Sequence, residues 1–244
     1  MCTDCGCSTR GTQEKAHEHL HDNPQLNDTK TISVIQKILD KNDHEANHNR
    51  SHLDNNGVLG INLMSSPGSG KTALLEALSE IAKFKFAVVE GDLETSKDAD
   101  RLISKGIDAV QIQTGSACHL DAFMVHKGLH DISLDAIDVC FVENVGNLVC
   151  PASYDVGTHL NIVLVSIPEG EDKIAKYPVM FRQADLILIT KTDLLPYFEY
   201  DIEAEKKEAR RIKPNVDILE INTKDTNSIQ KVADWIEFKQ KMRG

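Results

Sequence analysis

The sequence predicts a three-layer α/β fold in which helices cover both faces of a mainly parallel sheet. Two observations carry this prediction: short apolar runs alternate with amphipathic segments from residue 57 onward, and no internal repeat interrupts the alternation. Strands that alternate with helices are joined by right-handed crossovers, which place the helices on the two faces of one sheet. The 244 residues, of which 41% are hydrophobic, suffice for one such domain with an appendage.

Composition divides the chain into three parts. Residues 1–30 are polar and lack aromatic side chains, which predicts a flexible N-terminal tail that binds metal through its cysteines. In 31–56, apolar residues at helical spacing predict a short helix over 31–41, followed by a polar linker. Residues 57–244 are predicted to form the folded domain.

Within the folded domain, apolar runs predict buried strands, and amphipathic segments between most of them predict helices. The strands are expected at 57–64, 85–91, 108–113, 137–144, 160–167, 184–190 and 216–222. The helices are expected at 71–83, 96–105, 119–129, 201–212 and 226–241.

Charge and composition exclude several classes of partner. A net charge of −11 argues against nucleic acid, because binding phosphates requires a basic surface. No apolar run reaches the roughly 18 residues that span a bilayer, and the first residues lack the layout of a signal peptide. We therefore predict a cytoplasmic protein without a membrane partner, whose grouped cysteines are metal ligands or redox groups rather than disulfides.

A glycine-rich turn, "SSPGSGKTALLE", follows the first predicted strand and precedes a helix. In that setting Lys71 reaches the β- and γ-phosphates of a nucleotide, and the Thr72 hydroxyl binds Mg²⁺. Ser65 replaces the first glycine of the pattern, which requires a negative φ at that residue. The alternative is an ordinary strand-to-helix loop. The sequence favours a P-loop NTPase whose backbone N–H groups bind phosphate at Gly68, Ser69, Gly70 and Lys71.

The segment "TKTDLL" after the sixth predicted strand indicates guanine recognition. The Asp193 carboxylate can accept hydrogen bonds from guanine N1–H and N2–H₂, and the aliphatic part of Lys191 can lie across the base. The pattern resembles the Asn-Lys-x-Asp element of GTPases, with Thr190 in place of Asn. The backbone N–H of Thr223 is a further candidate for guanine O6. A solvated turn is the alternative.

Two acidic strand ends are candidates for the chemistry at the γ-phosphate. Asp92 ends the second predicted strand and is the candidate Mg²⁺ ligand, directly or through water. Glu143 ends the fourth and is followed three residues later by Gly146, whose N–H can reach the γ-phosphate. The alternative is that both carboxylates are merely polar residues at strand ends, without a role in chemistry. The site residues predicted to act in hydrolysis are therefore Lys71, Asp92, Glu143 and Gly146.

Cys118, His119 and Cys150 supply three ligands suited to Zn²⁺, Ni²⁺ or Cu⁺. A fourth ligand is missing from one chain, and a two-fold dimer would bring two such sets together. Chance burial of the thiols is the alternative. Cys150 lies four residues beyond Gly146, on the segment expected to move when the γ-phosphate leaves.

Three further thiols, Cys2, Cys5 and Cys7, can wrap one thiophilic ion without a folded scaffold. Histidines farther along can add weaker imidazole sites, or they are polar filler in a tail. These are His17, His19, His21, His44, His48 and His52.

Six segments together resemble the hydrogenase nickel-incorporation GTPases of the HypB family, of the SIMIBI class of P-loop GTPases. They are "CTDCGC", "SSPGSGKTALLE", "EGDLETSKDADR", "GSACHLDA", "VENVGNLVCP" and "TKTDLLPY". The resemblance implies a GTPase that dimerises with nucleotide and delivers nickel to the large subunit of a [NiFe] hydrogenase beside a small nickel chaperone. It also implies a tight nickel site at Cys2, Cys5 and Cys7.

The same resemblance implies a weaker Ni²⁺ or Zn²⁺ site near the dimer interface, formed by Cys118, His119 and Cys150. GTP and Mg²⁺ are expected to order 143–151, and turnover is expected to be slow because no intrinsic arginine finger is evident. The alternatives are a metal-storage protein with vestigial nucleotide binding, a small-molecule kinase, and the urease nickel-insertion GTPase. The last normally carries Cys-x-His rather than the adjacent pair found here.

Overall fold

The computed structural model describes residues 29–92, 97–115 and 117–243, with side-chain surroundings from residue 36 onward. Residues 1–28 of the predicted tail, with Cys2, Cys5 and Cys7, lie outside the described residues, and its last two residues are helical. Among those residues, no helix combines the length and the apolar character that crossing a bilayer requires.

Seven parallel strands form one sheet in the order β3-β2-β4-β1-β5-β6-β7, which confirms the predicted α/β fold. Each strand begins and ends within about three residues of its prediction. The strands are β1 (Leu59–Ser65), β2 (Phe86–Asp92), β3 (Asp108–Gln113), β4 (Val139–Glu143), β5 (Leu160–Ser166), β6 (Leu186–Thr190) and β7 (Asp217–Glu220).

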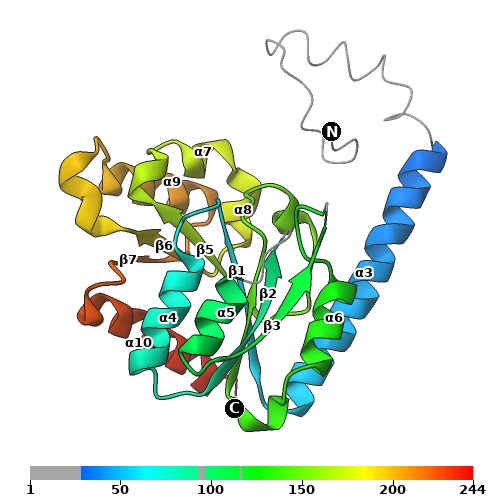
Figure 1. Cartoon of the computed structure of the whole chain (residues 1–244). Coiled ribbons are helices and arrows are strands. Elements are labelled where there is room, and N and C mark those ends of the chain that lie inside the picture. The colour runs from blue at the N-terminus through cyan, green and yellow to red at the C-terminus, as the bar shows by residue number, and fades with distance from the viewer. Residues whose placement is uncertain (1–28, 93–96, 116, 244) are drawn as a thin grey trace.

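Helices cover both faces of this sheet (Figure 1). One face carries α4 (Lys71–Ile81), α5 (Lys97–Ser104) and α10 (Thr226–Lys241). The opposite face carries α3 (Thr29–Asn55), α6 (Ala122–His130), α7 (Lys173–Lys176), α8 (Pro178–Gln183) and α9 (Ile202–Ile212). Short 3₁₀ turns are η1 (Leu134–Ala136), η2 (Cys150–Ser153), η3 (Ile167–Glu169) and η4 (Thr192–Tyr197).

Alternation along the buried strands fills two apolar layers. Leu59, Ile61 and Leu63 of β1 point toward α4 and α10, whereas Met64 packs into the layer on the other side. Because the inner strands are apolar on both sides, they stay buried and rigid. The carboxyl ends of these strands, from which the loops start, are therefore held in fixed positions relative to one another.

Helix α3 differs most from its prediction, because a single helix from Thr29 to Asn55 replaces the expected short helix and polar linker. Its buried side is a stripe at helical spacing: Asn42, Ala46, Asn49 and Leu53. The Asn42 amide donates to the Asp155 carbonyl at 2.8 Å, and its Oδ1 accepts from the Ala122 amide at 2.9 Å. Two of the four buried residues are asparagines, so hydropathy alone does not reveal this face.

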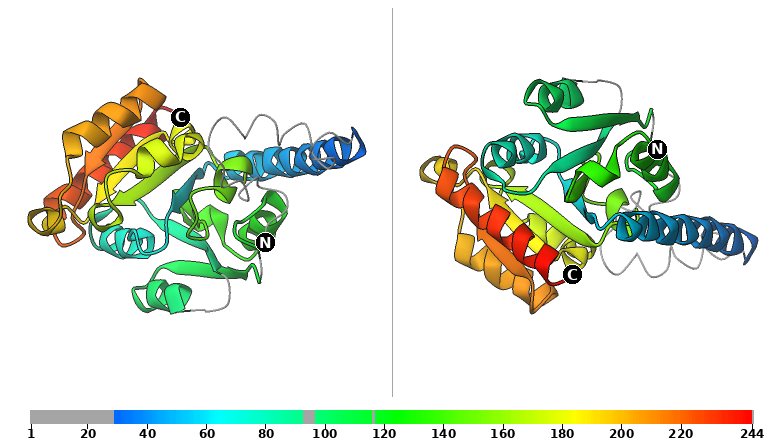
Figure 2. Two further views of the ribbon diagram at one scale, coloured as in Figure 1. Left: turned by 90° about the horizontal axis from the view of Figure 1, so that it is seen from above. Right: turned by 90° about the horizontal axis from the view of Figure 1, so that it is seen from below.

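The views along the sheet show α3 running beside α6, with the N-terminal part of α3 projecting away from the sheet (Figure 2). Helix α6 begins three residues later than predicted, because Asp121 is its N-cap and accepts a hydrogen bond from the Met124 amide at 2.8 Å.

Candidate functional site

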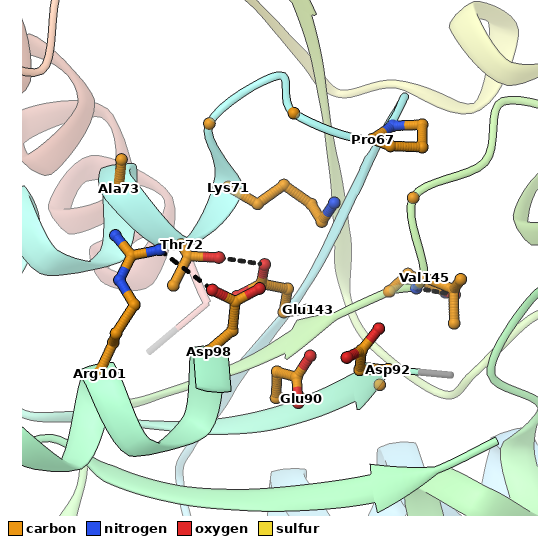
Figure 3. Close-up of a pocket in the computed structure, with 15 residues that line it drawn as sticks. Pro67, Lys71, Thr72, Ala73, Glu90, Asp92, Asp98, Arg101, Glu143 and Val145 are labelled. Carbon is orange, nitrogen blue, oxygen red and sulfur yellow. Dashed lines mark hydrogen bonds and ion pairs between the residues drawn. The ribbon is translucent and has the colours of Figure 1, made fainter. Parts of the chain in front are cut away.

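The carboxyl ends of β1, β2 and β4 meet at one edge of the sheet and form the candidate site. The register places Glu143 beside both Leu63 and Glu90. A pocket of about 330 Å³ opens there, and the close-up shows Lys71 reaching into it above the carboxylates of Glu90 and Asp92 (Figure 3). Its lining comes from the glycine-rich loop, β2, α5 and the segment after β4.

The glycine-rich loop has the backbone that phosphate binding requires. Gly68 and Gly70 have φ values of 76° and 100°, which side-chain-bearing residues rarely adopt. Ser65 does not share this conformation, since Lys191 is the one non-glycine residue with positive φ in the described part of the chain. Ser65 instead accepts a hydrogen bond from the Lys71 ammonium at 3.1 Å. The serine therefore helps to aim the lysine.

Two glutamates, Glu90 and Glu143, are buried in the protein interior beneath the glycine-rich loop. The Thr72 hydroxyl donates to Glu143 Oε1 at 2.9 Å, and burial raises the pKa of Glu143 to about 6, against the opposing effect of Lys71. Burial, followed by the charge of Glu143, raises the pKa of Glu90 to about 8. The Oε2 atoms of both glutamates are buried without a hydrogen-bond partner among the described residues. Such oxygens fit a bound Mg²⁺ with Thr72 and Asp92 beside it.

Glu90 is expected to make stability fall with rising pH. Between pH 4.5 and about 8 the folded protein keeps a proton on Glu90 that the unfolded chain has released, so folding is progressively disfavoured. The variant Glu90→Gln removes this cost. In thermal melts without Mg²⁺ or nucleotide, we expect E90Q to be more stable than the parent at pH 8 and to differ less at pH 5. The exposed Glu80→Gln is the control, and an equal gain at both pH values would contradict the assignment.

The segment after β4 touches the glycine-rich loop closely. A Cβ placed on Gly146 would lie 2.8 Å from the Pro67 Cα, so this position has no room for a side chain. Asn144 Oδ1 accepts hydrogen bonds from the Val145 and Leu120 amides, both at 3.0 Å. The segment thus contacts both the glycine-rich loop and the chain just after Cys118.

The candidate guanine residues lie on the other side of the glycine-rich loop. Lys191 has φ 59°, and its ammonium donates to the Gly68 carbonyl at 2.6 Å. The Thr190 hydroxyl donates to the Ser69 carbonyl at 2.7 Å. Asp193 forms an ion pair with Lys224, in which Oδ2 and Nζ are 3.1 Å apart, and Lys224 directly follows Thr223 in the chain. The fold therefore places Thr190 and Lys191 against the glycine-rich loop, and it brings Asp193 close to the segment that contains Thr223.

Cys118, His119 and Cys150 form a compact ligand set. The two sulfurs are 2.9 Å apart, His119 Nδ1 is 3.9 Å from Cys118 Sγ, and all three ligand atoms lie within 4.8 Å of one another. The Tyr154 ring stacks on His119 with centroids 4.0 Å apart. Burial lowers the pKa of His119, which favours the neutral imidazole that binds metals. This set fits a thiophilic ion.

One asparagine connects the thiols to the pocket. Asn147 Nδ2 donates to the Cys118 carbonyl at 3.2 Å, and its Oδ1 accepts from the Val149 amide at 2.9 Å. Asn147 follows Gly146 directly and precedes Cys150 by three residues. Asn147 therefore connects the segment that contains Gly146 to the segments that carry both sulfurs.

Several site residues were not predicted from the sequence. Glu90 is a charged residue inside an apolar strand, and this unusual placement is the sequence feature that could have identified it. Arg101 also lines the pocket, where it pairs with Glu76 at 2.7 Å and Asp98 at 3.0 Å. Glu169 accepts a hydrogen bond from the Ser69 hydroxyl at 2.6 Å and so stabilises the glycine-rich loop. The contacts of Arg101 with Glu76 and of Glu169 with Ser69 join elements that are far apart in sequence.

A glycine-rich loop between a central parallel strand and a helix, with buried carboxylates beside it, defines a P-loop nucleotide-binding protein. The family model described as "CobW/HypB/UreG, nucleotide-binding domain" matches residues 60–220. The chain is 50% identical to the hydrogenase/urease maturation factor HypB of Helicobacter hepaticus, over 92% of this chain and 94% of the relative. It therefore belongs to the HypB family of hydrogenase/urease maturation factors.

Solved structures agree with this assignment. The crystal structure of HypB from Helicobacter pylori in complex with nickel superposes with a TM-score of 0.81 at 43% identity, covering 83% of this chain and 96% of that one. HypB from Archaeoglobus fulgidus gives a TM-score of 0.77 at 36% identity, covering 83% of this chain and all of that one, 100%.

Proposed function

We propose that this protein is a GTP-hydrolysing nickel metallochaperone that delivers nickel during [NiFe]-hydrogenase maturation. The observation that carries the proposal is the segment from Glu143 to Cys150, which contacts the phosphate pocket at Gly146 and supplies a sulfur to the metal ligands at its other end. The nickel complex of the Helicobacter pylori relative supports the choice of metal.

In the proposed reaction the protein positions GTP and neutralises its charge. Lys71 and the loop N–H groups hold the β- and γ-phosphates, and Gly146 offers its N–H to the γ-phosphate. When bound, Mg²⁺ stabilises the charge that develops on the phosphate oxygens, and Thr72, Asp92 and the glutamates fit it. Glu143 already accepts from Thr72 and holds that hydroxyl in place. Turnover is slow in this proposal, because Arg101 is engaged with Glu76 and Asp98.

Nickel is the cargo of this cycle. GTP orders 143–151, sets Cys150 against Cys118 and His119, and favours a homodimer in which two ligand sets complete the coordination of Ni²⁺ or Zn²⁺. Hydrolysis relaxes the segment and releases the metal toward the hydrogenase large-subunit precursor. A small nickel-chaperone partner and the thiols at Cys2, Cys5 and Cys7 supply the metal.

Nickel transfer tests this proposal. The protein is loaded with one equivalent of Ni²⁺ and mixed with a chromogenic chelator in the presence of GTP, a non-hydrolysable GTP analogue or GDP. Delivery predicts that the metal is held with the analogue and released as GTP is consumed. Binding of several ions per chain with no effect of nucleotide would instead indicate storage.

Asp193 is expected to determine the choice of guanine. In Asp193→Asn the amide cannot accept both guanine hydrogen bonds, and each charge-assisted bond contributes about 1.5–3 kcal/mol, so GTP affinity should fall by about 100-fold or more. An amide can donate to the O2 carbonyl of xanthine, so affinity for xanthosine triphosphate should rise. Equilibrium titrations of both nucleotides measure this. Lys224→Ala removes the ion pair alone and should leave guanine selectivity intact, whereas unchanged selectivity in D193N would refute the assignment.

A further inference from the structure

Histidines and one glutamate line the contact between α3 and α6. On α3 they recur at helical spacing and face α6, and on α6 they are one turn apart. The two helices lie side by side in both Figure 1 and Figure 2. The residues, which we call the α3–α6 histidine cluster, are Glu45, His48, His52, His126 and His130.

Three members of the cluster converge closely enough to share one ion. Glu45 Oε1 is 3.1 Å from His126 Nδ1 and 3.7 Å from His48 Nδ1, and the three ligand atoms lie within 4.8 Å of one another. Ligands at about 2.0–2.2 Å from a tetrahedral ion are themselves about 3.3–3.6 Å apart. Because 57% of the His48 side chain is exposed, it can rotate into that geometry without disturbing the core.

Neighbouring groups hold His126 in the orientation of a ligand. The Asn49 amide nitrogen donates to the carbonyls of Ala122 at 2.8 Å and Val156 at 3.2 Å, which fixes its Oδ1 at 3.1 Å from His126 Nδ1. Two oxygens therefore face that nitrogen, so without a metal Nδ1 carries the ring proton and donates it to them. If an ion replaces this proton at Nδ1, the ring proton moves to Nε2, which lies 3.1 Å from His130 Nε2 and can donate to it. Histidine ligands usually have such a partner for their second nitrogen.

We propose that Glu45, His48 and His126 form a second transition-metal site, distinct from every cysteine site, that takes a divalent ion such as Ni²⁺ or Zn²⁺. Imidazole and carboxylate suit these ions, and three protein ligands leave a position open for water or exchange. The bound ion clamps α3 onto α6. The proposal is independent of the proposed GTPase cycle, since no member of the cluster lines the nucleotide pocket.

The segment 44–48, "HEANH", also matches the His-Glu-x-x-His spacing in which the two histidines of one helix bind zinc. The structure favours a different ligand set. Glu45 faces α6, where it meets His126, and His44 is exposed outside the convergent group. Variants at His44 and His126 therefore distinguish the two arrangements.

Metal titration of the full-length chain tests the site. In a background in which serine replaces the candidate thiol ligands, Ni²⁺ alone is titrated by calorimetry and Co²⁺ by absorption. We expect one ion per chain, a loss of affinity of at least about 10-fold in His126→Ala and in His48→Ala, and little change in the matched variant His44→Ala. Ni²⁺ should raise the melting temperature of the background but not of H126A. The background replaces Cys2, Cys5, Cys7, Cys118 and Cys150.

Absence of binding in the folded background, or unchanged affinity in H126A, would overturn the proposal. If the serine background does not fold, the comparison is made with all cysteines present. H126A must then bind one ion fewer than the parent, and the Co²⁺ absorption it loses must lack a thiolate charge-transfer band. An equal ion count in parent and variant overturns the proposal there. GTP hydrolysis, measured in the same samples, reports separately on the proposed function.

Discussion

Replacing Lys71 with alanine is expected to lower the rate of GTP hydrolysis by about 100- to 1,000-fold, the effect of removing one preorganised charge at a transition state. The Lys71 side chain is buried and already aimed into the pocket by its bond to Ser65. It also opposes the rise in the pKa of Glu143, so its loss should leave that carboxyl more protonated. Both consequences weaken the binding of phosphate and Mg²⁺.

Single-turnover release of phosphate at saturating GTP and Mg²⁺ measures the effect of K71A on chemistry, and titration with a fluorescent nucleotide separates it from binding. Lys105→Ala is the matched control, because Lys105 is exposed and its ion pair with Glu80 lies outside the pocket lining. A K71A rate within a few-fold of the parent would mean that the loop binds nucleotide without acting in hydrolysis.

The strands were predictable because each is a short apolar run that can be recognised locally, as in β1, β4 and β6. The prediction that all seven are buried was wrong for β3 and β7, because these strands lie at the edges of the sheet and are only partly covered. The extent of α3 was not predictable, because its buried stripe includes the polar residues Asn42 and Asn49. These side chains are satisfied by backbone groups of residues 122, 155 and 156, and only the folded chain brings those groups near. Helices α7 and α8, of 4 and 6 residues, are too short for a periodic pattern.

The residues of the candidate site also fall into two groups: those in local sequence patterns, which were predictable, and those brought together only by the fold. The glycine-rich loop and the Lys191 to Asp193 element are local patterns, so the sequence alone locates them. The approach of Cys118 to Cys150 depends on which strands are neighbours, and a spacing of 32 residues does not determine a distance. The convergence of Glu45 with His126 across 81 residues had no sequence signal at all, because a histidine on α6 is indistinguishable from an ordinary surface residue.

The cysteine pair is expected to carry the coupling between nucleotide and nickel. In a chain with serine at Cys2, Cys5 and Cys7, Cys150→Ala should weaken Ni²⁺ binding at the remaining thiol site by at least about 10-fold and abolish its response to GTP. Coupling is reciprocal, so the parent should bind the GTP analogue more tightly with Ni²⁺ present, by about 5- to 150-fold. Titrations of each ligand with and without the other measure both effects.

Asn147→Ala separates ligation from coupling, because it keeps both sulfurs and His119 but removes the bond to the Cys118 carbonyl. Its affinity for Ni²⁺ without nucleotide should stay near that of the parent, while the difference between the GTP analogue and GDP shrinks. If C150A still responded to nucleotide as the parent does, the segment after β4 would not be the link. The response would then have to reach the metal through Cys118 and His119 alone, from the end of β3 rather than from Gly146.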